Sequence, residues 1–98
     1  MSEETRPQPD WKQRNFHQVM VLICDTFNMT HPQMVSLRQR IEKVYGSQKQ
    51  GKAHVSVQAL AILAYQRLDA GETLDEVLDI KSGKLLKLGR KIDEVQLR

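Results

Sequence analysis

The chain has 98 residues, a formal net charge of +3, one cysteine and five aromatic side chains. This length is that of one domain, with a modest core that aliphatic side chains must fill. A single cysteine, Cys24, excludes an internal disulfide framework, and the longest apolar stretch, Ala59 to Tyr65, is too short to cross a bilayer. We therefore expect no membrane partner, while the mild basic charge suits a polyanion.

The first nine residues are polar and include two prolines, Pro7 and Pro9. They predict a flexible tail over residues 1–9, followed by a single helical domain over residues 10–98. The start of the chain lacks the basic and then apolar segments of a secretory signal peptide. Together with the lone cysteine, this favours an intracellular protein, cytoplasmic or nuclear, over a secreted one.

Two amphipathic helices are predicted in the first half of the domain. We expect the first over residues 11–27, with Asp10 as its N-cap. The second is expected over residues 32–45, after Thr30 or His31, because Pro32 suits a first helical position and Gly46 suits a C-terminal end. Apolar residues recur at helical spacing in both segments. These are Phe16, Val19, Met20, Ile23 and Phe27 in the first, and Met34, Leu37, Ile41, Val44 and Tyr45 in the second.

A third helix, over residues 55–70, is predicted to lie at the centre. Ser56 can cap it, and Val55 and Leu60 have the spacing of a hydrophobic staple. Residues 59–65, ALAILAY, leave no polar face, which is typical of a helix enclosed by its neighbours. Gly71 is expected to end this helix.

The last third of the chain predicts a short helix, a turn and a basic amphipathic helix. Thr73 and Glu76 have the spacing of a capping box, which opens a short helix through Asp79. After a turn at residues 81–83, the last helix is expected to carry an apolar stripe of Leu85, Leu88, Ile92 and Val95 beside a basic stripe of Lys84, Lys87 and Lys91. The predicted fold is all-α: a compact bundle of about five helices around a central apolar helix, ending in a helix-turn-helix-like pair.

Residues with catalytic or metal-binding chemistry do not form a recognisable motif. The three histidines have no metal-ligand spacing with Cys24 or with each other. The sequence has no glycine-rich phosphate loop and no nucleophile elbow. We therefore expect a binding protein rather than an enzyme, with no cofactor, no metal and no small-molecule substrate.

The segment from Gly51 to Val95 resembles one cyclin-like repeat of transcription factor IIB and of archaeal transcription factor B. In that family a small hydroxyl residue leads into an alanine-rich helix, as Ser56 leads into residues 59–65 here. A capping box follows, matched by residues 73–77, TLDEV, and then a basic closing helix, matched by residues 84–95. Upstream, Pro32 and Val35 match the start of the family's second helix, and the resemblance covers most of residues 14–96.

This resemblance implies a cyclin-like fold whose short helix and last helix contact DNA near a promoter. The chain departs from the family in two respects, because it has room for one repeat rather than two, and its single cysteine excludes the zinc ribbon. A complete basal factor is therefore excluded. Similar single repeats in a subunit of the eukaryotic origin recognition complex and in cyclins imply that the fold alone does not fix the partner.

Two functions are predicted, with different residues. The first is a small regulator of transcription that binds double-stranded DNA through its last helix and the preceding polar loop, using Ser82, Lys84, Lys87, Arg90, Lys91, Lys49 and Lys52. The alternative is a protein-interaction module, an adaptor or subunit of a transcription, replication or viral assembly, or a homodimer, which would use Trp11, Phe16 and Met20. Trp11 is either a cap over the core or an exposed anchor. Head-to-tail association of acidic and basic surfaces is a further interpretation of the uneven charge.

Overall fold

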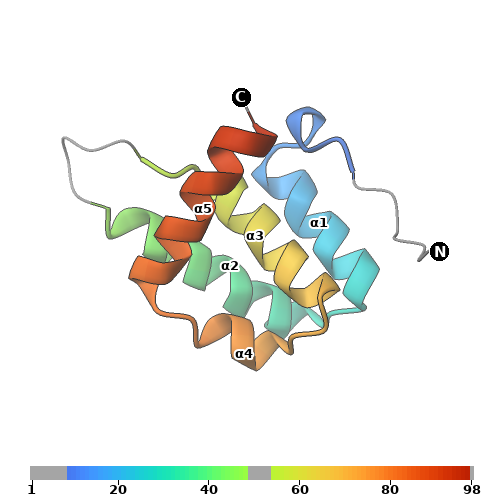
Figure 1. Ribbon diagram of the computed structural model, residues 1–98. Helices are drawn as coiled ribbons and strands as arrows, with labels where there is room; N and C mark the ends of the chain where they lie inside the picture. The colour runs from blue at the N-terminus through green and yellow to red at the C-terminus, as the bar shows by residue number, and fades with distance from the viewer. Residues whose placement is uncertain (1–8, 49–53, 98) are drawn as a thin grey trace.

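The computed structural model describes residues 9–48 and 54–97, and within these ranges the protein is all-α and compact. The described residues contain a 3-10 turn and five α-helices: η1 (Trp11–Gln13), α1 (Phe16–Phe27), α2 (His31–Gly46), α3 (Val57–Asp69), α4 (Leu74–Leu78) and α5 (Ser82–Gln96). Figure 1 shows α3 in the middle, with α1 and α5 on its two sides and α4 across one end. The predicted bundle of about five helices is confirmed.

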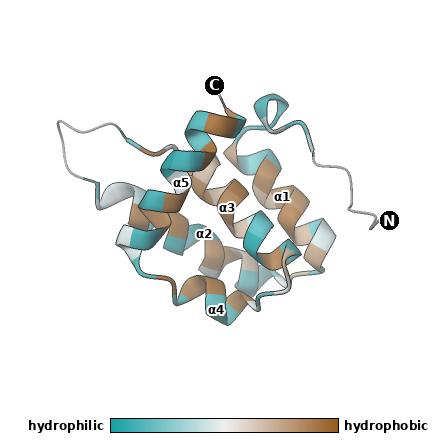
Figure 2. Cartoon of the chain, in the orientation of Figure 1, coloured by the Kyte–Doolittle hydropathy of each residue, from teal (hydrophilic) through white to brown (hydrophobic). Residues whose placement is uncertain are grey.

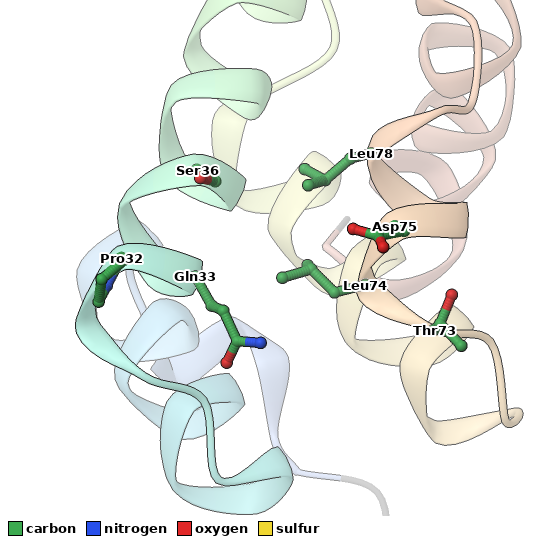
Figure 3. A pocket seen from close by; sticks show the side chains of 7 residues that line it. All are labelled: Pro32, Gln33, Ser36, Thr73, Leu74, Asp75 and Leu78. Carbon is green, nitrogen blue, oxygen red and sulfur yellow. The ribbon is translucent and has the colours of Figure 1, made fainter.

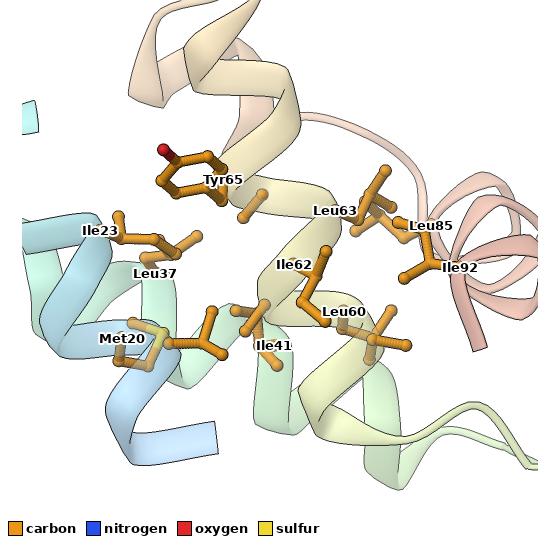
Figure 4. Packing of buried hydrophobic residues seen from close by; sticks show 14 of the residues in the cluster. Met20, Ile23, Leu37, Ile41, Leu60, Ile62, Leu63, Tyr65, Leu85 and Ile92 are labelled. Carbon is orange, nitrogen blue, oxygen red and sulfur yellow. The ribbon is translucent and has the colours of Figure 1, made fainter. Parts of the chain in front are cut away.

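The core is built around α3, as its sequence predicts. All seven residues from Ala59 to Tyr65 are buried, and α1, α2 and α5 each pack against this helix. Figure 4 shows the side chains of Met20 and Ile23 from α1, and of Leu85 and Ile92 from α5, reaching α3 from different directions. A helix without a polar face is stable here because neighbours cover it on every side.

Side-chain caps fix the starts of four helices. At three of them a hydroxyl or amide accepts from the third helical N–H while that residue's side chain accepts from the cap N–H, a complete capping box. The three pairs are Asn15 with Gln18, Thr30 with Gln33, and Thr73 with Glu76. At α3, Ser56 accepts from Ala59. The predicted caps Thr30, Ser56 and Thr73 are confirmed, and Gly71, at φ 103°, follows α3 as expected.

The first helix begins later than predicted. Asp10 caps only the three-residue turn η1, and its side chain makes no cap hydrogen bond. The backbone is extended at Arg14 and Asn15, and α1 starts at Phe16, where Asn15 and Gln18 form a complete capping box. The expected apolar face survives this change, since Val19, Met20 and Ile23 are buried.

The end of α2 also differs from the prediction. Tyr45 was expected on the apolar face, but 42% of its surface is exposed. Gly46 is the last helical residue, yet it does not adopt the left-handed conformation of a glycine cap. The helix ends instead through Ser47, whose hydroxyl donates to the carbonyl of Val44 at 2.7 Å, so no glycine is required.

The helix α5 begins earlier than predicted, and Leu85, Leu88 and Ile92 of its predicted apolar stripe pack in the core while Val95 does not. Ser82 and Gly83, expected in a turn, are its first two residues, and α4 ends at Leu78. The buried residues are Leu85, Gly89 and Ile92, while Val95, expected on the apolar stripe, is 73% exposed. At Gly89 the helix lies close to Val55 and α3, since an added Cβ would be 2.7 Å from Val55 Cγ1. Figure 2 shows both hydrophilic and hydrophobic residues along α5.

Candidate nucleic-acid interface

A basic face covers the solvent side of α5. It consists of four exposed cations: Lys84, Lys87, Arg90 and Lys91. The ion pairs found among the described residues, Arg38 with Glu42 and Arg67 with Glu72, involve none of them. Four cations on one helix without a carboxylate partner in the described ranges make a surface that can bind phosphates.

The two acidic residues of α5 leave most of this positive charge uncompensated. Asp93 is half-buried, and its carboxylate accepts hydrogen bonds from the backbone N–H and the hydroxyl of Ser56, at 3.0 and 3.1 Å. This carboxylate therefore faces the start of α3 rather than the lysines. Glu94 is exposed and lies four residues after Arg90 and three after Lys91, so it is the one anion within the basic face.

The basic face has a fixed position because α5 is held at several points. Leu85, Gly89 and Ile92 pack into the core, and Asp93 binds the cap of α3. Before the helix begins, the Arg40 guanidinium donates to the carbonyl of Ile80 at 2.8 Å, which ties the α4–α5 connection to α2. The cations are therefore presented by a helix that packing holds rigid.

The start of α5 points unpaired backbone donors to one end of the basic face. Lys81 is the N-cap, and its side chain makes no cap hydrogen bond, so the first-turn N–H groups lack a side-chain acceptor there. Ser82, predicted to contact nucleic acid, is half-buried in this first turn. Two other predicted residues, Lys49 and Lys52, lie outside the described residues.

The residues predicted to bind a protein partner lie mainly in the core. Trp11 is 2% exposed and its ring meets Tyr65 edge-on at 5.1 Å, so it has the capping role rather than the exposed one. Met20 is 3% exposed. Phe16 is half-buried, with the Arg38 guanidinium 5.9 Å from its ring centroid.

A small groove lies between α1 and α2, and of the three residues predicted to bind a partner it includes Met20. Its volume is about 100 Å³, and it is lined by His17, Met20, Val21, Cys24, Met34 and Arg38. Burial, and then the charge of Asp25, raise the pKa of the Cys24 thiol. The signal in the sequence was Val21, an apolar residue off the core face of α1, which is 44% exposed.

The described residues contain no group of three or more histidine, cysteine, aspartate or glutamate side chains placed to hold a metal ion. None of the helices in residues 9–48 and 54–97 combines the length and the apolar character needed to cross a membrane. The chain matches no family model, no curated protein and no solved structure.

Proposed function

We propose that this protein binds double-stranded DNA through the basic face of α5. The observation that carries this proposal is the set of four exposed cations on one rigid helix, with no ion pair to a described carboxylate. Lysine and arginine side chains bind DNA by replacing the counterions of its phosphates. The first-turn N–H groups of α5 add neutral donors for one more phosphate oxygen.

In this proposal α4 and α5 act as a helix-turn-helix pair within a cyclin-like repeat. The order of the helices supports the idea, because a buried central helix is followed by a capped short helix and a basic closing helix. The central, short and closing helices are also the parts of the chain whose sequence resembles transcription factor IIB. Lys84, Lys87, Arg90 and Lys91 are all proposed to contact phosphates. Lys84 is the nearest of them to the start of the second helix, where helix-turn-helix proteins also reach base edges.

The test is a fluorescence-anisotropy titration of a labelled, mixed-sequence duplex with two charge-reversed variants. Replacing Lys87 and Lys91 by Glu should weaken binding at least about tenfold and reduce the salt slope by about two, one unit for each lost phosphate contact. The matched control replaces Lys12 and Arg38 by Glu, which changes the net charge equally. Arg38 lines the α1 side of α2, and Lys12 belongs to η1, so neither lies on α5.

If both double variants weaken DNA binding equally, the loss of affinity reflects the net charge of the protein, and the assignment of the binding site to α5 is overturned. A second pair, Lys87 and Lys91 replaced by Arg, keeps the charge and should keep the affinity within about threefold, because most contacts are to phosphates. Circular dichroism on every variant separates loss of binding from loss of fold.

A protein-interaction module is the second candidate, and the α1–α2 groove favours it. Two methionines, Cys24 and the exposed Val21 give this groove a soft apolar lining that can adapt to a partner's side chains. The partner would insert an apolar helix or a single large side chain, as in helix-in-groove recognition. If a partner captured from cells is released by Val21→Lys but not by Lys87→Glu with Lys91→Glu, this second function replaces the first.

A further inference from the structure

A larger groove separates the starts of α2 and α4. Its volume is about 360 Å³, and its walls are Pro32, Gln33 and Ser36 from α2 and Thr73, Leu74, Asp75 and Leu78 from α4. Figure 3 shows the side chains of Leu74, Asp75 and Leu78 projecting from α4 towards α2. The groove therefore offers two leucines and one carboxylate together on the α4 side.

Of the four carboxylates at residues 72–79, two make a hydrogen bond or an ion pair with other described residues and two do not. Glu76 accepts from the N–H of Thr73 in the capping box, and Glu72 pairs with Arg67 at 2.9 Å. Asp75 and Asp79 are exposed, one helical turn apart, and neither carboxylate has a hydrogen bond or ion pair within the described residues. Asp75 lines the groove, and Asp79 directly follows Leu78, the last lining residue of α4, so the two carboxylates make this side of the groove negative.

A surface of opposite charge to this groove lies on α5 of the same chain. Lys87, Lys91 and Val95 recur every four residues and so lie in one row along the helix. Val95 is 73% exposed, the most exposed of the large hydrophobic residues described. Two cations followed by an apolar side chain complement two carboxylates beside two leucines.

We propose that the α2–α4 groove binds the basic face of α5 from a second copy of the chain. In this arrangement Val95 covers Leu74 and Leu78, while Lys87 and Lys91 meet Asp75 and Asp79. A symmetric contact of either surface with itself would bring like charges together, so the contact joins two different surfaces and propagates head to tail. Because α5 is used, DNA and the second copy compete for it, although self-association does not require DNA binding.

Sedimentation velocity over a range of protein concentrations tests this proposal with two single-surface variants. One variant replaces Asp75 and Asp79 by Lys and loses the groove's negative charge. The other replaces Lys87 and Lys91 by Glu and loses the row on α5. The wild-type sedimentation coefficient should rise with concentration at about 50 mM salt and much less at about 500 mM, where charges are screened beyond a few Å.

Each variant alone should associate at least about tenfold more weakly than the wild type, because like charges would then face each other. Mixing the two should restore association, because the intact α5 of the first variant meets the intact groove of the second, and the two reversed surfaces are again opposite in charge. A matched variant, Asp10 and Asp25 replaced by Lys, changes the net charge as much as the first variant does and should associate as the wild type does.

A wild type that stays monomeric at every concentration would overturn the proposal, as would a mixture that forms no dimer. Because Asp75→Lys places a cation in the first turn of α4, against the helix dipole, Asp75→Asn with Asp79→Asn provides a second variant that removes the charge without reversing it. It should also weaken association. The first variant leaves α5 intact and should still bind DNA, so failure of this inference is distinguishable from failure of the proposed function.

Discussion

Asp93, in the last third of α5, accepts two hydrogen bonds from Ser56, the residue that caps α3. The Ser56 hydroxyl donates to this carboxylate and accepts from the N–H of Ala59, so one serine connects the two helices. The Asp93 carboxylate lies at the N-terminus of α3, so its negative charge also interacts favourably with the positive end of that helix's dipole. The helix that carries the basic face is thus joined to the central helix by polar contacts as well as by packing.

Removing this carboxylate should destabilise the fold. Asp93→Ala leaves the half-buried N–H of Ser56 without its acceptor, and we expect a loss of about 1–3 kcal/mol in the free energy of unfolding. Asp93→Asn retains one acceptor oxygen and should lose less. Urea unfolding measures both, with the exposed Glu94→Gln as the control that should change little. A loss for Glu94→Gln equal to that for Asp93→Ala would contradict this role.

Adding a methyl group at Gly89 should also destabilise the protein, although alanine is the better helix former. The gain in helix propensity is about 1 kcal/mol, whereas forcing a methyl into a filled core costs about 1–3 kcal/mol. Here the new Cβ would meet Val55 Cγ1 at 2.7 Å and Leu60 Cδ2 at 3.1 Å. Val55 is fully buried and stiff, so we expect a net loss of about 1 kcal/mol in thermal or urea unfolding.

Two companion variants separate crowding from propensity at this position. A Cβ at Gly83, in the first turn of α5, has nothing within 4 Å, so Gly83→Ala should be neutral or stabilising by up to about 1 kcal/mol. Combining Gly89→Ala with Val55→Ala should cost less than the sum of the single losses, by about 1 kcal/mol. Strict additivity of the two would rule out the contact.

The turn η1 should detach when its polar link to α3 is cut. The Gln58 amide donates to the carbonyl of Trp11 at 2.9 Å and also to the carbonyl of Arg14. Gln58→Leu removes both bonds, so Trp11 should become more accessible than its present 2% exposure. We expect its fluorescence emission to shift to the red and acrylamide quenching to increase, while the helical circular dichroism is kept. Unchanged emission would show that the ring packing against Tyr65 holds the turn by itself.

Cys24 should react slowly with alkylating reagents at neutral pH. Burial and the nearby Asp25 raise its thiol pKa, so less of the reactive thiolate is present in the folded protein than in the unfolded chain. The iodoacetamide rate, followed by mass spectrometry, should be lower in buffer than in urea. The ratio of the two rates should approach one as the pH rises past both pKa values. A native rate equal to the urea rate at neutral pH would contradict the shift.

Much of this fold could be predicted because its signals are local. A run of seven apolar residues identified α3 as the central helix, and Thr73 with Glu76 marked the start of α4. The break at Arg14 and Asn15 was missed, although Asn15 and Gln18 have the spacing of the same capping box with an amide in place of the hydroxyl. Asp10 and Gln13 have the same spacing, but the Asp10 side chain makes no cap hydrogen bond and the turn after it ends at Gln13.

Leu85, Leu88 and Ile92 of α5 pack in the core as periodicity predicts, but the buried position of Gly89 could not be predicted, because it depends on another helix. Periodicity alone favoured the stripe through Leu88 and Val95, while Gly89 counted only as a weak helix former. In the fold Gly89 is buried against Val55 and Leu60, and Val95 faces away from the core. The Ser56–Asp93 hydrogen bonds and the α2–α4 groove are likewise formed by residues far apart in the sequence. No local sequence pattern predicts them.

The salt dependence of DNA binding by the wild-type protein tests the central claim most directly. Anisotropy titrations of a labelled duplex at two or more salt concentrations give the slope of log association constant against log salt. Four phosphate contacts from the basic face predict a slope between about −3 and −4. Absence of binding at low salt, or binding with a slope near zero, would contradict the claim that Lys84, Lys87, Arg90 and Lys91 form a nucleic-acid interface.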